Sequence, residues 1–259
     1  MGKEIHPTSI ISPGAEIAED TYIGPFCIIH DKVRLGKGSR LISNVIIEGA
    51  TEIGENCTVY PFTSIGLPPQ DMKYKGEETG VTIGSQNTIR EYVTIHRASV
   101  SGDGITSIGD GNFLMAYVHI AHDCKIGNSV IMANLATLAG HVSVGDHAVV
   151  GGLVAIHQFT RIGAYAMVGG FSGVGQDIPP YMIASGARVK LFGLNTVGMK
   201  RHGFPDSTVN ELKKAYKILF REKRTLKGAI KKIQEDLPYT DEIKHLIEFI
   251  QKNKRGICR

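Results

Sequence analysis

An aliphatic residue recurs at every sixth position along most of this chain, in a register that survives two interruptions. An α-helix repeats about every 3.6 residues and a simple strand alternates, so neither has this period. A coil of short strands and turns does, because each hexad forms one side of a prism and directs one side chain inward. The pattern therefore predicts a parallel β-helix of hexapeptide repeats. The aliphatic positions are Ile5, Ile11, Ile17, Ile23, Ile29, Leu35, Leu41, Ile47, Ile53, Val59, Ile65, Ile83, Ile89, Ile95, Ile108, Leu114, Ile120, Ile126, Met132, Leu138, Val144, Val150, Ile156, Ile162, Val168 and Val174.

The neighbours of these aliphatic residues also repeat. The residue two positions earlier is small or β-branched, as in Cys27 and Thr51, which suits a tight corner. Glycine often follows the aliphatic residue, as in Gly24 and Gly36. These glycines predict turns with a positive φ angle.

The two interruptions predict loops at residues 66–82 and 96–107. Counted in hexads, three to a coil, Ile65, Ile95 and Ile120 fall on one edge of the prism, followed by Leu138 and Ile156. Both loops therefore leave from the same edge.

The six-residue repeat of aliphatic positions ends before the C-terminal part of the sequence. We expect a β-helix over residues 1–190 and a helical domain over residues 191–259 that covers the open end of the coil. Its helices are predicted at residues 207–221, 226–235 and 241–253. Thr208 and Glu211 have the spacing of a capping box that would open the first of them.

The composition argues against a membrane-spanning, secreted or disulfide-bonded protein. No apolar run approaches the roughly 18 residues that span a bilayer, and residues 1–6 do not resemble a secretory signal. The four cysteines show no paired spacing, and two of them occupy corner positions. We therefore expect a reduced, cytoplasmic protein without disulfides or a zinc ribbon.

Positive charge is concentrated in the C-terminal quarter. Residues 200–259 hold 16 Lys and Arg against 8 Asp and Glu, a balance of +8, so the rest of the chain carries −4 of the total +4. This charge is either a solvated helical surface or a docking site for an acidic partner. Nucleic acid is disfavoured as that partner because the basic segment lacks interleaved aromatic residues.

Half of the histidines fall on the edge that carries the loops. Five of the ten lie beside its aliphatic residues, together with Asp123, Gly140 and Gln158. Such clustering next to two loops predicts a polar cleft. The five are His96, His119, His122, His141 and His157.

Three chemistries could use this cleft. Zinc is disfavoured because His119 and His122 are three residues apart and would point to opposite faces of a strand. Cys124 is disfavoured as a nucleophile because it occupies a small corner position. General-base catalysis by a neutral imidazole fits best.

Several motifs together resemble the bacterial family of acyl-carrier-protein:UDP-N-acetylglucosamine O-acyltransferases, over essentially the whole chain. They include His119-Ile-Ala-His122-Asp123-Cys124, Leu138-Ala-Gly-His141, Ala155-Ile-His-Gln-Phe159, Arg90-Glu with Thr94-Ile-His-Arg97, and Gly198-Met-Lys-Arg201. The resemblance implies a left-handed coil and a homotrimer with active sites between subunits. It also implies the first step of lipid A synthesis, in which an (R)-3-hydroxyacyl chain moves from acyl carrier protein to the glucosamine 3-hydroxyl of UDP-N-acetylglucosamine. No metal or bound cofactor is expected.

The resemblance also implies roles for individual residues. His122 would be the general base, and the Gly140 backbone N–H would stabilise the thioester oxyanion. Either Asp123 or Asp71 would orient His122. Gly170 would set the length of the acyl chain, with about 12 to 14 carbons expected. The substrate-binding residues would include His96 and His157. The sugar would be surrounded by Gln70, Asp71, Lys73, His119, His141 and Gln158, and the nucleotide would be met by Asn195 and Arg201.

Two features leave alternatives open. Val197 and His202 stand where family members often have an acidic residue and a second arginine, which affects the nucleotide contacts. The accepting atom is either a 3-hydroxyl or a 3-amino group. A related N-acyltransferase normally carries an extra N-terminal uridine-binding domain, whereas this sequence starts directly with repeats. A repeat scaffold without chemistry is disfavoured by the edge histidines.

Overall fold

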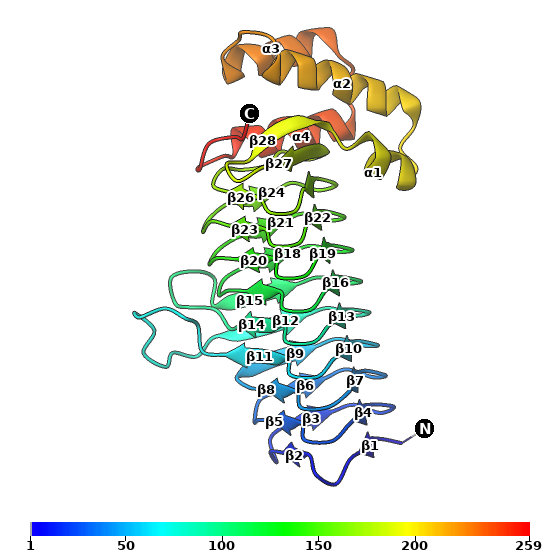
Figure 1. Cartoon of the computed structure of the whole chain (residues 1–259), viewed down its shortest axis with the longest axis vertical. Helices are drawn as coiled ribbons and strands as arrows, with labels where there is room; N and C mark the ends of the chain where they lie inside the picture. Colours follow the sequence, from blue (N-terminus) through cyan, green and yellow to red (C-terminus); the bar gives the residue numbers. More distant parts are fainter. Residues whose placement is uncertain (1) are drawn as a thin grey trace.

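The computed structural model describes residues 2–259 as a three-sided prism of short strands topped by helices (Figure 1). Successive strands pass in turn to three sheets, here named A, B and C, in which every pairing is parallel except the last one of sheet A. This is the predicted left-handed parallel β-helix.

Each sheet collects every third strand of the prism, apart from the last two strands of sheet A, and most strands have only two residues. Sheet A contains β1 (Glu4–Ile5), β4 (Tyr22–Ile23), β7 (Arg40–Leu41), β10 (Thr58–Val59), β13 (Thr88–Ile89), β16 (Phe113–Leu114), β19 (Ile131–Met132), β22 (Val149–Val150), β25 (Met167–Val168), β27 (Met182–Ser185) and β28 (Lys190–Leu194). Sheet B contains β2 (Ile10–Ile11), β5 (Ile28–Ile29), β8 (Ile46–Ile47), β11 (Ser64–Leu67), β14 (Thr94–His96), β17 (His119–Ile120), β20 (Thr137–Leu138), β23 (Ala155–Ile156) and β26 (Gly173–Val174). Sheet C contains β3 (Glu16–Ile17), β6 (Arg34–Leu35), β9 (Ala50–Ile53), β12 (Gly80–Ile83), β15 (Ile105–Ile108), β18 (Lys125–Ile126), β21 (Ser143–Val144) and β24 (Arg161–Ile162).

The register confirms the edge that was derived by counting hexads. Ile65 pairs with Ile95, Ile95 with Ile120, Ile120 with Leu138, and Leu138 with Ile156, all in sheet B. These side chains point into the core and are buried. The histidines beside them therefore belong to one face and its adjoining corner.

The corners have a different backbone from the one expected. We name them AB, BC and CA after the sheets that they join. Positive φ occurs at the third residue after the aliphatic, as in Asp20 (58°) and Phe26 (59°), and not at the glycine that follows the aliphatic. The prediction for those glycines was wrong, apart from Gly66 (79°). Glycine is needed at position 24 because a Cβ there would lie 1.8 Å from the Ile42 carbonyl oxygen of the next coil.

Two loops project from the side of the prism that carries sheet B (Figure 1). The two predicted interruptions are partly strand, because β11, β12, β14 and β15 extend into them. Their irregular parts are residues 68–79 and 97–104. The Arg97 guanidinium anchors both, because it donates to Glu48 Oε1 (3.0 Å), the Gly66 carbonyl (2.9 Å) and the Tyr74 hydroxyl (3.0 Å).

Four helices cover the C-terminal end: α1 (Thr196–Arg201), α2 (Asp206–Phe220), α3 (Leu226–Asp236) and α4 (Asp241–Gln251). The three longer ones match the predicted helices within two residues. The capping box was wrong, because α2 has Pro205 at its N-cap without a side-chain hydrogen bond, and Thr208 lies inside the helix. Within residues 2–259, no helix is long and apolar enough to cross a membrane.

Candidate active site

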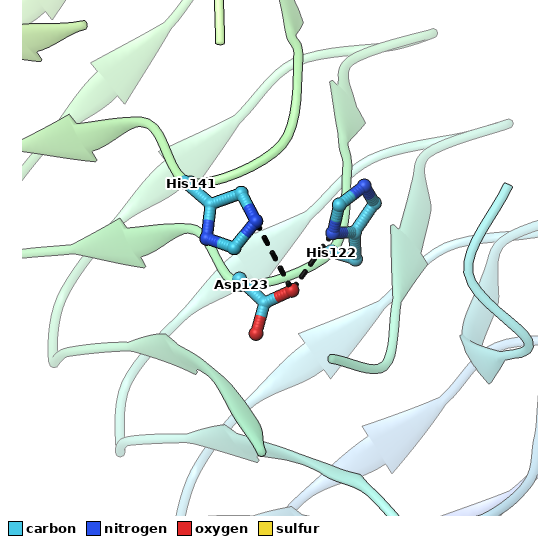
Figure 2. Close-up of side chains that lie close together, drawn as sticks. All are labelled: His122, Asp123 and His141. Atoms are coloured by element: carbon cyan, nitrogen blue, oxygen red, sulfur yellow. Dashed lines mark hydrogen bonds and ion pairs between the residues drawn. The ribbon is translucent and has the colours of Figure 1, made fainter. Parts of the chain in front are cut away.

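Two histidines and an aspartate converge at the BC corner (Figure 2). His122 and Asp123 follow β17, and His141 follows β20 one coil above. The His122 Nδ1–H group donates to Asp123 Oδ2 at 2.8 Å, and His141 Nε2 lies 3.7 Å from the same oxygen. The Asp123 carboxylate thus accepts a hydrogen bond from His122 and lies within ion-pair distance of His141.

The corner backbone makes this convergence possible. Neighbours on a strand point to opposite faces, which argued against Asp123 as the partner of His122. Asp123 instead has φ of 61°, and the turn brings its carboxylate back to the preceding ring. Asp71, the other option, accepts a hydrogen bond from the Lys73 backbone N–H at 3.0 Å in its own loop. Within the chain, Asp123 therefore orients His122.

His122 lies against the predicted oxyanion donor. A Cβ at residue 140 would lie 2.7 Å from His122 Nε2 and 2.5 Å from Cε1, so only glycine fits there. In the described part of the chain the Gly140 N–H makes no hydrogen bond. Since Nδ1 carries the proton donated to Asp123, Nε2 has a free lone pair beside this free N–H.

Two of the neighbouring histidines, His119 and His141, are held in the neutral form. Burial lowers the pKa of His119 to about 4, and the nearby His96 and His122 rings add to the effect. Burial also lowers the pKa of His141, whose ring stacks on Phe159 with centroids 4.5 Å apart. His119 Nδ1 shares a hydrogen bond with the Thr94 hydroxyl at 2.7 Å.

Other predicted substrate-binding residues lie on the same side of the chain. His96 is buried, and its Nδ1–H donates to the Pro68 carbonyl at 2.6 Å, so it anchors the first loop. Gln70 and Lys73 are exposed on that loop. His157 and Gln158 are exposed at the end of β23, above the histidine cluster.

Some predicted residues lie at other corners. Asn195 is buried, accepts from Gly198 N–H at 3.0 Å as the N-cap of α1, and donates to the Tyr165 carbonyl at 3.0 Å near the CA corner. Arg201 is exposed at the end of α1, and Gly170 is exposed at the AB corner. One chain does not bring these three residues to His122.

Several contacting residues were not predicted from the sequence. Ser99 donates to Asp123 from both its N–H and its hydroxyl, and Thr106 Oγ1 accepts from Asp123 N–H at 2.8 Å. Arg255, in the C-terminal tail, donates to His157 Nδ1 at 3.0 Å. The sequence singled out His202 but not its partner His147, on which it packs with ring centroids 4.6 Å apart. No short motif marks these residues, because each contact joins distant parts of the chain.

Two other chemistries can be compared with this geometry. His122, Asp123 and His141 offer ligand atoms within 4.8 Å of one another, so this trio could hold a metal ion. An ion there would have to replace the proton on His122 Nδ1. Cys124 is buried, and burial raises the pKa of its thiol to about 12, which disfavours a nucleophilic thiolate.

The chain is similar to known proteins over its whole length. A family model described as "Udp N-acetylglucosamine O-acyltransferase; Domain 2" matches residues 177–258, and a bacterial transferase hexapeptide model matches residues 105–140. A Thermodesulfovibrio yellowstonii protein named acyl-[acyl-carrier-protein]--UDP-N-acetylglucosamine O-acyltransferase is 73% identical, covering 99% of both chains.

More distant relatives agree. A Syntrophobacter fumaroxidans protein of the same name is 47% identical over 99% of this chain and 100% of its own. The solved structure of LpxA from Acinetobacter baumannii superposes with a TM-score of 0.96 at 45% identity, covering 98% of this chain and 99% of its own. The chain therefore belongs to the acyl-[acyl-carrier-protein]--UDP-N-acetylglucosamine O-acyltransferase family.

Proposed function

We propose that this protein transfers an (R)-3-hydroxyacyl chain from acyl carrier protein to the glucosamine 3-hydroxyl of UDP-N-acetylglucosamine in lipid A biosynthesis, in the cytoplasm. The observation that carries the proposal is the free Nε2 of His122, held by Asp123 and packed against Gly140. This pairing of a base with an oxyanion donor suits acyl transfer.

The reaction would proceed by addition and elimination. His122 Nε2 removes the proton from the sugar hydroxyl as its oxygen attacks the thioester carbonyl carbon. The Gly140 N–H stabilises the negative charge on the carbonyl oxygen. When the tetrahedral intermediate collapses, the carbon–sulfur bond breaks and the proton on His122 passes to the departing phosphopantetheine sulfur. Asp123 stabilises the imidazolium that forms between these steps.

A homotrimer would assemble the complete site. If sheet B of one subunit faced sheet A of the next, the BC corner with His122 would approach the CA corner with Arg201 of its neighbour. The AB corners would then converge on the three-fold axis. The side chains at the AB corner support this arrangement. A row of large exposed side chains, here named the AB ridge, runs along this corner, and such apolar rows are typical of contacts between subunits. The ridge consists of Phe26, Phe62, Tyr92, Tyr117, Leu135, Leu153 and Phe171.

Mixing two inactive chains tests the shared site. Chains carrying His122→Ala or Arg201→Ala would be co-expressed with different tags, and hybrid trimers purified through both tags. If each site takes His122 from one chain and Arg201 from the next, one of the three sites in every hybrid trimer combines the two unmutated residues. Recovered activity in the hybrids is the expected result. Hybrids as inactive as the parent trimers would contradict a site shared between subunits.

The basic helix α2 would bind the acidic carrier protein. Lys213, Lys214 and Lys217 are exposed on it. Lys217→Glu should raise KM for acyl carrier protein and weaken its dependence on ionic strength, while KM for the sugar nucleotide stays unchanged. Lys244→Glu on α4 makes the same change of charge elsewhere and serves as the control. Equal effects on both substrates would show that α2 has only a structural role.

Turnover with a panel of acyl carrier proteins tests the activity itself. Mass spectrometry of the product distinguishes an ester at a 3-hydroxyl from an amide at a 3-amino group. An ester of UDP-N-acetylglucosamine is the expected product. A protein that binds both substrates without turnover would instead be a scaffold.

A further inference from the structure

Ser99, in the second loop, reaches the active site from outside the repeats. It follows β14 and is buried. Its backbone N–H donates to Asp123 Oδ2 at 3.0 Å, and its hydroxyl donates to the same oxygen at 2.7 Å. A charged acceptor makes both hydrogen bonds stronger than neutral ones.

Few other groups fix the Asp123 carboxylate. Oδ2 also accepts from His122, whereas the buried Oδ1 has no partner within residues 2–259. A Cβ at residue 102 would lie 2.2 Å from Oδ1, so the loop closes over the carboxylate at a glycine. Apart from the His122 ring, Ser99 therefore supplies every hydrogen bond that orients this side chain.

The directions of the hydrogen bonds follow from the number of protons available. The single hydroxyl proton of Ser99 goes to Asp123, so at 2.6 Å Ser101 must donate its own proton to Ser99 Oγ. At 3.4 Å, Ser101 Oγ is then left to accept from His141 Nε2. His141 therefore carries its proton on Nε2, whereas His122 carries its proton on Nδ1.

We propose that Ser99 is a positioning residue for the acyl transfer proposed above. By holding Asp123 Oδ2 in line with His122 Nδ1–H, it keeps His122 Nε2 unprotonated and directed at the acceptor hydroxyl. The second loop, which interrupts the repeats, is therefore part of the catalytic apparatus through this serine. The inference rests on the proposed function for its kinetic consequence, but the tautomer of His122 is a property of the resting protein.

The test combines kinetics with nitrogen NMR of the histidine rings. In the unmodified protein, the His122 Nδ1 signal should be of the protonated type and the Nε2 signal of the unprotonated type. Ser99→Ala should mix the two tautomers and lower kcat by roughly ten-fold, as expected for one hydrogen bond to a charged group. KM should change little. Ser99→Thr keeps the hydroxyl and should restore both readouts.

Ser39→Ala is the matched control, because Ser39 is equally buried but lies in the lower coils, where its hydroxyl donates to the Gly54 carbonyl. It should lower thermal stability without affecting kcat or the tautomer. If Ser99→Ala does not fold, Ser99→Cys, with a weak donor of similar size, should show the same mixed tautomers. An unchanged His122 tautomer in a folded Ser99→Ala or Ser99→Cys protein would overturn the proposal. An inactive unmodified protein with the expected tautomer would instead overturn only the proposed function.

Discussion

The BC and AB corners have the same backbone and opposite chemistry. At the BC corner the positive-φ position holds Asp123 (61°), His141 (60°) and Phe159 (63°). At the AB corner it holds Leu135 (64°) and Leu153 (57°) among the exposed ridge residues. The repeat therefore fixes one conformation at each corner, and the side chain placed there decides whether the corner does chemistry or makes apolar contact.

Rings at the repeated position stack on one another at both corners. Phe62, Tyr92 and Tyr117 stack in sequence with ring centroids 5.0 and 4.7 Å apart. Their rings repeat with the coils, so each makes the same contact as the one below. At the BC corner, His141 stacks on Phe159 in the same way, with ring centroids 4.5 Å apart, whereas His122 precedes the repeated position by one residue and its ring is perpendicular to that of His141, at 88°. His122 thus lies outside the repeated row of side chains.

The largest expected effect comes from removing the base at the BC corner. His122→Ala should lower kcat by roughly 10²- to 10⁴-fold, because the variant lacks the imidazole that accepts the proton of the sugar hydroxyl. Its melting temperature should stay close to that of the unmodified protein, since His122 is outside the core. His141→Ala should act more on KM, as a substrate-positioning residue would. Near-normal turnover by folded His122→Ala would contradict the mechanism.

A charge on the AB ridge should separate the subunits. Leu135→Glu would bury a carboxylate between chains, which costs far more than the lost apolar contact. Sedimentation velocity should show smaller species with little activity. Ile105→Glu, the same type of change at a half-exposed position on sheet C, should leave the assembly intact. If Leu135→Glu sediments like the unmodified protein, the ridge is not the contact surface.

The Gly170 position should determine acyl-chain length. Each buried methylene contributes about 0.8 kcal/mol, so a groove shortened by several carbons changes selectivity by orders of magnitude. Gly170→Met should therefore move the optimum to a shorter donor without abolishing activity on it, and Gly170→Ala should have an intermediate effect. Competition between acyl carrier proteins of different chain length measures this. An unchanged preference for acyl-chain length in a folded Gly170→Met trimer would show that another residue limits the length of the chain.

The smallest expected effect concerns stability at acidic pH. His119 has a pKa of about 4 in the folded chain against an ordinary value of 6.5, so between these values the unfolded chain binds the additional proton. Its contribution to stability is complete above about pH 6.5 and is lost as pH falls toward 4. The melting temperature should decline across this window, and less steeply in His119→Gln. Equal slopes for both proteins would contradict the assignment.

The sequence predicted the fold because its period is a direct consequence of the coil geometry. Ile65 and Ile156 could be placed on one edge by counting hexads, and this needed no information about the loops. The capping box of α2 was wrong because Pro205, which fixes its own φ, stands at the N-cap, so that Thr208 lies inside the helix.

The candidate site was predicted only in part. His122, Asp123 and Gly140 follow from motif and register, and the structure brings them together. Ser99 could not be predicted, because the path of an irregular loop over a distance of 24 residues is decided by tertiary contacts. Asn195, Arg201 and Gly170 are not joined to His122 in one chain, so their roles remain predictions.

The stacking of one coil on the next also has a consequence for folding. Most strand pairs join residues 18 apart, such as Tyr22 with Arg40, so the chain can grow by adding one coil at a time to an ordered end. The two ends are unequal: helices cover the last coil, whereas Ile5, an inward-facing residue of the first coil, remains 42% exposed. Opening should therefore start at the N-terminal coils and spread upward, like the fraying of a helix from one end. Because His122 lies many coils above that end, the lower prism can open and close while the catalytic corner stays ordered.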